Sequence, residues 1–238
     1  MIGKKIMQFD SVTSTNDFIK QNKQNLNHGT VVSSSMQSKG RGRKGQVWIS
    51  EKGNLYFSFL LSENIAYKDI ARILFQTSLA LVKVLEQFDI KASIKYPNDI
   101  IVKGKKIAGI LIETSGVSAL DCVTVGVGLN VLQKSIPHLE GKAISMTELT
   151  TNPLRLDDVL HRFIEIYNEL EDETLSYIHG CYMKYSMVIG KYIEVSGKEG
   201  RILDVTRSGH LVVEIDGEEH IYEDKELSLE ELYEGNQK

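Results

Sequence analysis

Short apolar runs alternate with polar turns along the first 131 residues, and this pattern predicts strands interrupted by one long helix. The helix is expected from residue 69 to residue 88, where Ile73, Leu81 and Phe88 recur on one face at helical spacing. Strands are expected at residues 7–12, 30–36, 55–61, 94–102, 106–113 and 123–131. The combination favours an α+β fold built around one sheet.

The last third of the chain carries a different pattern. Asn152 and Pro153 predict a helix start, and an apolar stripe then continues to about residue 178. From residue 190, glycines separate short strand candidates at residues 192–195, 201–205, 211–215 and 220–222. Short, evenly spaced strands are typical of a small β-barrel. We therefore expect a large domain over residues 1–185 and a small β domain over residues 186–238.

Composition and charge exclude several classes of protein. The 238 residues are 42% hydrophobic, which is enough for a substantial core. The net charge of -4 argues against broad binding of nucleic acid. No apolar run is long enough to span a membrane or to act as a secretory signal. Cys122 and Cys181 are far apart and show no metal-ligand spacing, so we expect reduced thiols in a cytoplasmic protein without a metal site of its own.

The most distinctive segment is GRGRKG at residues 40–45, which lies between two expected strands. Gly40 and Gly42 leave the backbone N–H groups accessible, while Arg41, Arg43 and Lys44 add positive charge. Together these features suit a loop that binds a phosphate or a carboxylate. The loop lacks the G-x-x-x-x-G-K-[ST] pattern and no helix follows it, which excludes a P-loop. A solvated basic loop without a ligand is the alternative interpretation.

Other polar residues interrupt the apolar pattern. Ser14, Thr15 and Asn16 stand at a helix entry, where they either cap the helix or bind a small polar group. The segment KYPND at residues 95–99 breaks an apolar strand, which favours a bend that faces a site. Lys106 opens the following strand, and a hairpin would return it to that bend. The alternative for Lys106 is a lysine in solvent.

Two glycines are also placed at strand periodicity. Gly126 and Gly128 fall on the same face of the strand expected at residues 123–131, and Asn130 shares that face. Glycines at such positions mark a close approach by a ligand or by another segment of backbone. The sheet is therefore expected to have one face stripped of side chains.

Five of these segments resemble, in the same order, the motifs of biotin protein ligases. They are STN at 14–16, GRGRKG at 40–45 with Trp48, KYPND at 95–99, KIAGIL at 106–111 and GVGLNV at 126–131. Many members of that family begin with a DNA-binding winged helix-turn-helix, and a first motif at residue 14 indicates the monofunctional type that lacks it. The family often has an arginine two positions before the loop tryptophan. This chain has Gln46 there, so the charge is lost at that position.

The resemblance implies a mixed-sheet catalytic domain of the biotin/lipoate ligase type and a C-terminal SH3-like β-barrel. It implies an AMP-forming ligase that uses ATP and Mg²⁺ to activate biotin to biotinyl-5′-AMP. The acceptor would be a lysine in the biotin carboxyl carrier protein or domain of acetyl-CoA carboxylase or a related carboxylase. A homodimer is compatible with the resemblance. The loop around residues 38–47 would be mobile without ligand and ordered with it.

The resemblance also implies a role for individual residues. The catalytic residues would be Arg41, Arg43, Asp99 and Lys106, with Lys106 bridging the biotin carboxylate and the phosphate. Biotin would contact Ser14, Thr15, Asn16, Gln37, Gly40, Arg41, Gly42, Arg43, Lys106, Gly109 and Gly128. ATP or the adenylate would contact Arg43, Lys44, Trp48, Asn98, Lys106 and Asn130. Magnesium would arrive bound to ATP, with few direct protein ligands.

Two other functions stay open at this stage. A lipoate or octanoate ligase shares the catalytic fold, but those enzymes carry a longer glycine tract in place of the GRGR loop. A non-catalytic biotin sensor would need a DNA-reading element or a partner chain.

Overall fold

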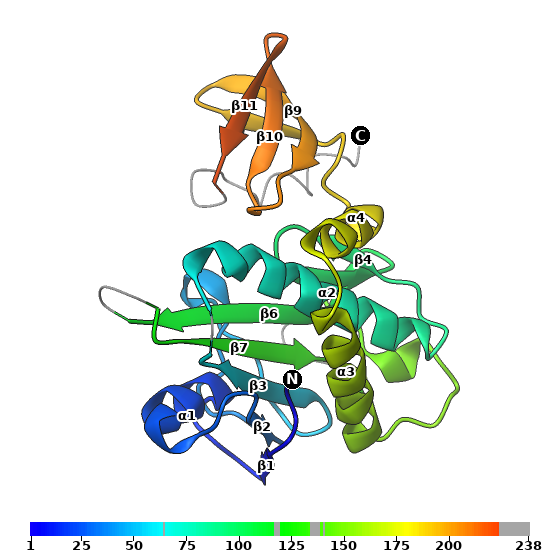
Figure 1. The fold of residues 1–238 in the computed structure, drawn as a ribbon. Coiled ribbons are helices and arrows are strands. Elements are labelled where there is room, and N and C mark those ends of the chain that lie inside the picture. Colours follow the sequence, from blue (N-terminus) through cyan, green and yellow to red (C-terminus); the bar gives the residue numbers. More distant parts are fainter. Residues whose placement is uncertain (64, 117–119, 134–138, 140, 224–238) are drawn as a thin grey trace.

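The computed structural model describes residues 1–238 except residues 64, 117–119, 134–138, 140 and 224–238, and it contains two separate sheets (Figure 1). The strands of the larger sheet are β1 (Ile6–Phe9), β2 (Val31–Ser34), β3 (Leu55–Leu61), β4 (Ser93–Lys95), β5 (Asp99–Val102), β6 (Lys105–Ser115) and β7 (Cys122–Leu129). Their spatial order is β1-β2-β3-β7-β6-β5-β4. Strands β1 and β2 run parallel and the other neighbours antiparallel, so the expected mixed sheet is confirmed.

The helices cover both faces of this sheet. The α-helices are α1 (Thr15–Asn22), α2 (Ile70–Glu86), α3 (Leu156–Glu171) and α4 (Leu175–Tyr185). Short 3₁₀ turns lie at η1 (Lys23–Asn25), η2 (Arg43–Gly45), η3 (Tyr67–Asp69) and η4 (Met146–Glu148). Helix α2 occupies most of the range expected at residues 69–88, because its apolar residues form the stripe that the core requires.

Strand periodicity divides the sheet into an apolar face and a polar face. Phe57 of β3 and Val127 of β7 lie in the main core with α2 and α3. The alternate positions point the other way, and a Cβ on Gly126 would meet the Asn16 side chain of α1. Helix α1 packs on this second face through Ile19, in a small apolar cluster of its own. The two expected glycines therefore do lie on one face, and it is the face opposite the main core.

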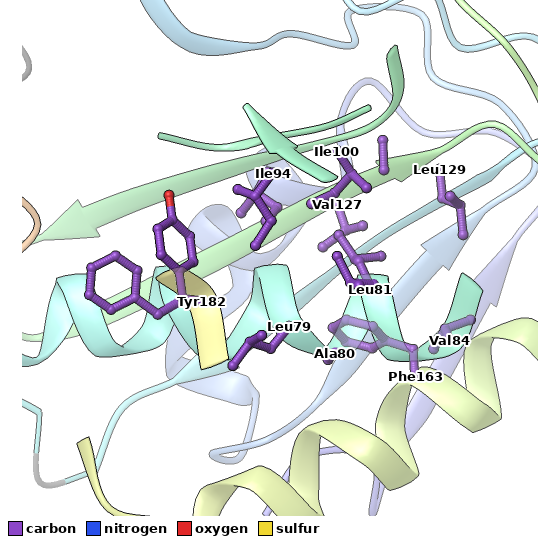
Figure 2. Packing of buried hydrophobic residues seen from close by; sticks show 14 of the residues in the cluster. Leu79, Ala80, Leu81, Val84, Ile94, Ile100, Val127, Leu129, Phe163 and Tyr182 are labelled. Atoms are coloured by element: carbon purple, nitrogen blue, oxygen red, sulfur yellow. The ribbon is translucent and has the colours of Figure 1, made fainter. Parts of the chain in front are cut away.

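The main core lies between α2 and the sheet, as Figure 2 shows. Leu79 and Leu81 of α2 are fully buried, and Phe163 of α3 closes the layer. Burying a side chain of this size stabilises the fold by about 1.5–3 kcal/mol. Phe57 and Phe163 add an edge-to-face ring contact with centroids 4.8 Å apart. The core holds the strands that carry the polar face in a fixed register.

The helix expected from residue 152 to about residue 178 is two helices, so that prediction was wrong. Helix α3 begins at Leu156, after a loop that contains Asn152 and Pro153. It ends at Glu171, and α4 begins only after Thr174. The Thr174 side chain accepts a hydrogen bond from the backbone N–H of Tyr177, which caps the new helix. The apolar stripe continues across this break because both helices pack on the same core.

The C-terminal strands form a four-stranded antiparallel sheet with the order β11-β10-β9-β8. Their bounds are β8 (Tyr192–Val195), β9 (Lys198–Val205), β10 (Leu211–Ile215) and β11 (Glu218–Tyr222). The four expected strands are confirmed, while β8 and β11 do not pair to close a barrel in the part of the chain that is described. Figure 1 places this sheet beyond α2 and α4. Within the described residues, no helix has the length and apolarity needed to cross a membrane.

Candidate functional site

A cavity of about 250 Å³ opens on the polar face of the large sheet. Its floor is formed by β6 and β7, and its walls by the start of α1, the glycine-arginine loop and the β4–β5 hairpin. Most residues that the sequence singles out line it, namely Ser14, Thr15, Asn16, Gln37, Arg41, Gly42, Arg43, Lys44, Trp48, Asn98, Asp99, Lys106, Gly109 and Gly128. Segments spread over 115 residues of sequence therefore converge on one site.

The start of α1 provides neutral hydrogen-bonding groups at one end of the cavity. Ser14 is the N-cap and accepts from the N–H of Asp17 at 3.4 Å, so the capping interpretation holds and the residue lines the cavity as well. Thr15 donates its backbone N–H to the Gln37 side-chain oxygen at 2.9 Å. Ser58, on β3, is fully buried and lies 2.6 Å from the side-chain oxygen of Asn16. These contacts fix the orientation of the polar groups before any ligand binds.

Arg41 is held by two carboxylates at this end. Its guanidinium donates to both oxygens of Asp17, at 2.6 and 2.7 Å, and to Glu113 of β6 at 3.0 Å. The hydrogen bonds from Arg41 lower the pKa of Asp17 below its ordinary value, and Asp17 in turn raises the pKa of Arg41. Lys20 also contacts Glu113, at 2.6 Å. Burial would raise the pKa of Glu113, but hydrogen bonds and charges from its partners outweigh burial, so the pKa lies below its usual range.

Arg43 lies at the other end of the cavity in different surroundings. It donates to the side-chain oxygen of Asn98 at 3.1 Å, and the Asn98 amide donates to the backbone oxygen of Ile110 at 2.8 Å. Burial lowers the pKa of Arg43, while Tyr96 and Asp99 nearby act in the opposite direction. The guanidinium stays charged because its ordinary pKa is above about 12. A partly desolvated cation at this position attracts an anionic ligand strongly.

Lys106 pairs with Asp99 beside Arg43. Its ammonium lies 2.7 Å from a carboxylate oxygen of Asp99 and 5.0 Å from the centre of the Trp48 ring. The return of Lys106 to the KYPND bend is confirmed, since β5 and β6 pair antiparallel and a register shift follows Ile100. Both side chains of the pair are about a quarter to a third exposed, at 34% and 22%, so a ligand can reach them.

Trp48 covers the glycines of β6 and β7. Gly109 and Gly128 are directly paired, and a Cβ on either would lie within 2.9 Å of an indole atom. The Trp48 indole therefore lies over the bare strip in this structure, and the biotin contacts implied for Gly109 and Gly128 stay a prediction. The Trp48 ring N–H is buried without a hydrogen-bond partner among the described residues. Such a donor calls for an acceptor, which a ligand or a water molecule supplies.

Gln46 and Val47 complete the loop on the solvent side. The Gln46 backbone oxygen accepts the N–H of Gly42 at 2.7 Å, which closes the turn around Arg43. Both side chains are exposed and line the cavity mouth. The position that often holds an arginine therefore borders the cavity, and here it presents a neutral amide.

Gly40 and Asn130 are the two candidates that the structure does not bring to the cavity wall. A Cβ on Gly40 would lie 2.3 Å from the Ser50 hydroxyl and 2.4 Å from the Trp48 backbone oxygen, so glycine is needed there for the loop to fold. The Asn130 amide is buried and donates to the backbone oxygens of Ile144 and Lys106, at 3.2 and 3.4 Å. It holds the backbone of Lys106 and Ile144, and its contact with ATP stays a prediction.

Asp17, Glu113, Ser58 and Tyr96 were missed as candidates. Glu113 is four positions beyond Gly109 on β6, so strand periodicity alone would have placed it on the polar face. Asp17 follows STN directly, but its pairing with Arg41 depends on how α1 docks on the sheet. In the described part of the chain, no cluster of three His, Cys, Asp or Glu side chains is placed to hold a metal. The cavity thus suits a ligand with a neutral polar head and an anionic group.

Comparisons with known proteins agree with this geometry. The model of the biotin/lipoate A/B protein ligase family matches residues 7–130. The chain is 32% identical over 139 residues to the bifunctional ligase/repressor BirA of Bacillus spizizenii, covering 57% of this chain and 43% of that protein. It is 35% identical over 99 residues to the biotin–[acetyl-CoA-carboxylase] ligase of Paracoccus denitrificans, covering 40% of this chain and 41% of that protein. The chain thus spans less than half the length of these two relatives.

A solved structure extends the likeness to nearly the whole chain. The biotin protein ligase of Aquifex aeolicus, in complex with biotin and ATP, superposes with a TM-score of 0.76 at 28% identity. The match covers 95% of this chain and 98% of that one. Both sheets of the present chain therefore have counterparts in that fold.

Proposed function

The chain belongs to the biotin/lipoate A/B protein ligase family, and we propose that it is an ATP-dependent biotin protein ligase. The observation that carries this proposal is one cavity with two unlike ends. Neutral hydrogen-bonding groups lie at the start of α1, and Arg43 and Lys106 lie at the opposite side of the same floor. Biotin has a ureido ring and a carboxylate tail. The ring matches the hydrogen-bonding groups at the start of α1, and the carboxylate matches Arg43 and Lys106.

The first step joins the biotin carboxylate to the α-phosphate of MgATP. A carboxylate oxygen attacks the α-phosphorus, the bond to the bridging oxygen breaks, and pyrophosphate leaves with that bond's electron pair. The product is biotinyl-5′-AMP. Lys106 and Arg43 reduce the repulsion between the two anions, and fixed cations act most strongly in a site that excludes water. Trp48 and the loop cover the product, which slows its hydrolysis.

The second step transfers the biotinyl group to a lysine. The neutral amine of the acceptor attacks the carbonyl carbon of the anhydride, AMP leaves, and the amine gives up a proton. Free lysine has a pKa of about 10.4, so the amine must lose a proton before it attacks. Asp99 is our candidate to orient the amine or to accept that proton, because it lines the cavity next to Lys106.

The remaining assignments belong to the same proposal. The acceptor is the biotin carboxyl carrier domain of acetyl-CoA carboxylase or a related carboxylase, as the name of the Paracoccus relative suggests. Mg²⁺ enters with ATP. The C-terminal sheet is the SH3-like domain, the boundary lies near residue 185, and the protein is cytoplasmic. The protein can form a homodimer. Residues 38–47 move to admit ligands and close over the adenylate.

One assay tests the proposal. Purified protein is incubated with biotin, MgATP and pyrophosphatase, and biotinyl-AMP is measured before a carrier domain is added. We expect the adenylate to form and the carrier lysine to be modified. Binding of biotin without adenylate would indicate a sensor instead. Turnover of lipoate or octanoate without biotin binding would overturn biotin as the substrate, and only the family assignment would remain.

A further inference from the structure

The tip of the β4–β5 hairpin forms one wall of the cavity. Its residues, from Lys95 to Asp99, all line the site. On the cavity side, Asn98 receives the hydrogen bond from Arg43 and Asp99 receives the one from Lys106. The position of this tip therefore determines where two cations and one carboxylate meet the ligand.

The same tip is held from behind by two buried tyrosines. The Tyr96 hydroxyl donates to the backbone oxygen of Gly209 at 2.6 Å, across 113 residues of sequence. The Tyr182 hydroxyl, on α4, donates to the backbone oxygen of Pro97 at 3.2 Å. Tyr96 is 3% exposed, and Tyr182 is fully buried and packs on Phe75 of α2.

Gly209 belongs to the turn between β9 and β10 of the C-terminal sheet, and backbone hydrogen bonds close this turn. Thr206 donates its N–H to the His210 oxygen at 2.7 Å, and Gly209 donates to the Thr206 oxygen at 2.9 Å. A φ of +86° favours glycine at position 209, and a Cβ there would lie 3.3 Å from the Ala71 side chain of α2. The turn thus rests on the catalytic domain with little room to shift.

The Tyr96 hydroxyl is a permanent donor at this contact. Burial raises the pKa of Tyr96 to about 12, with Arg43 acting in the opposite direction. The phenol therefore keeps its proton throughout the neutral range, and the Gly209 oxygen always has its donor. In Figure 1 the C-terminal sheet lies on the side of α2 and α4.

We propose that Tyr96 is a positioning residue, through which the β9–β10 turn of the C-terminal sheet fixes the hairpin tip and thereby Asn98 and Asp99. This inference rests on the proposed ligase function. The C-terminal sheet would thereby affect adenylation through the positions of Asn98 and Asp99, without touching the ligand itself. Among the described residues, the start of α1 makes no hydrogen bond to Tyr96, Asn98, Asp99 or Gly209, so we expect binding of biotin alone to be independent of this contact.

The test uses the full chain with Tyr96→Phe, which removes the hydroxyl and keeps the ring. Tyr185→Phe is the matched control, because its hydroxyl bonds to Glu86 at 2.9 Å, away from the cavity lining. Three quantities are measured: biotin affinity, the adenylation rate with its dependence on MgATP, and amide hydrogen exchange over residues 95–102 and 206–210. If Tyr96→Phe does not fold, Tyr182→Phe tests the same tip from α4.

We expect Tyr96→Phe to lower the adenylation rate at saturating MgATP by about tenfold, since small displacements of reacting groups are costly. Exchange should rise in both segments, biotin affinity should stay within about twofold, and Tyr185→Phe should change nothing. Unchanged exchange and rate would overturn the proposal, as would a parallel loss of biotin binding and adenylation. If the wild type makes no adenylate, the ligase proposal fails. The exchange data then still show whether the turn and the tip are linked.

Discussion

Arg41 and Arg43 lie two residues apart in one loop, yet the structure gives them opposite surroundings. Arg41 meets two carboxylates, Asp17 and Glu113, at hydrogen-bond distance, and its pKa is raised. Arg43 donates to the neutral amide of Asn98, and burial lowers its pKa. The charge of Arg41 is largely balanced within the protein, whereas Arg43 lies at the end of the cavity where Lys106 also stands.

The difference teaches that a shared motif does not give its residues a shared role. Arg41 ties the loop to α1 and β6, and through Glu113 it belongs to the network that orients Asn16. Arg43 belongs with Lys106 and Asp99, around the position where the two anions meet in the proposed reaction. We therefore separate an anchoring end of the cavity, around Arg41, from a reacting end, around Arg43. The following predictions test this separation, from the largest expected effect to the smallest.

Lys106→Ala should have the largest effect. Loss of a cation that stabilises developing charge typically costs about 10²–10³ in rate, so adenylate formation should fall by at least about 100-fold. The affinity for biotin should change much less, because the anchoring end is intact. Lys103→Ala, on the exposed turn before β6, is the control and should leave the rate unchanged. Unchanged adenylate synthesis in Lys106→Ala would remove Lys106 from its role.

Asp99→Asn should impair the second step more than the first. Proton transfer by a positioned side chain contributes about 10²–10⁴ to a rate, so transfer from preformed adenylate to the carrier should fall about 100-fold. Adenylation should fall less than about tenfold, because the amide still bonds to Lys106. Single-turnover rates of the two steps give the comparison. Equal losses in the adenylation rate and the transfer rate would mean that Asp99 only supports the hairpin.

The two arginines should separate in a pair of variants. Arg43→Ala should weaken adenylation and accelerate leakage of the adenylate, with little change in the free energy of unfolding. Arg41→Ala leaves Asp17 without its bidentate partner and Glu113 with Lys20 as its remaining cation, so it should loosen the loop, weaken biotin binding and destabilise the fold. A double-mutant cycle of Arg41 with Asp17 should give a coupling of about 1–2 kcal/mol in chemical denaturation. The cycle of Arg43 with Asp17 should give almost none, and equal couplings would erase the distinction between the two ends.

Acid should weaken the anchoring end selectively. The folded-state pKa values of Asp17 and Glu113 are depressed, so folding favours their ionised forms. The stability that they contribute is complete above their unfolded pKa values, about 4, and is lost as the pH falls through the lower folded values. The difference in unfolding free energy between wild type and Arg41→Ala should therefore be constant from about pH 7 to pH 5 and shrink below about pH 4. A difference that is as large at pH 3 as at pH 7 would contradict the pairing.

Gln46→Arg should have the smallest effect. The side chain is exposed at the cavity mouth, where an added charge is screened by salt and contributes about 1 kcal/mol at most. The KM for MgATP should fall about two- to fivefold at low salt and return to the wild-type value in high salt. A larger, salt-independent gain would mean that position 46 enters the closed site.

Much of the reacting end could be predicted from the sequence, because local patterns carry it. The KYPND interruption predicted a bend, the hairpin returned Lys106 to Asp99, and strand alternation placed Gly126 and Gly128 on one face. These conclusions need only the geometry of a hairpin and a strand. The position of the glycine-arginine loop between two strands, with no α-helix directly after it, could also be predicted from the local pattern.

The rest depends on contacts that no local pattern shows. The Arg41–Asp17 pair spans 24 residues and exists only because α1 docks on the sheet. The glycine strip was expected to receive a ligand or another backbone segment, and the position of the Trp48 indole over it depends on how the loop folds back on β6 and β7. The Asn130 amide donates to the backbone oxygen of Ile144, a residue that lies near it only in the folded chain. The helix expected to reach residue 178 is divided at Thr174, where a capping hydrogen bond begins α4.

The central claim is that the cavity joins the biotin carboxylate to the α-phosphate of ATP. The most direct measurement follows the carboxylate oxygen. The protein is incubated with MgATP, a carrier domain and biotin that carries ¹⁸O in both carboxylate oxygens. The mass of the released AMP is then measured by mass spectrometry. Attack on the α-phosphorus followed by acyl transfer predicts AMP that carries one ¹⁸O atom. Unlabelled AMP would contradict the account, because the carboxylate oxygen would then never have bonded to that phosphorus.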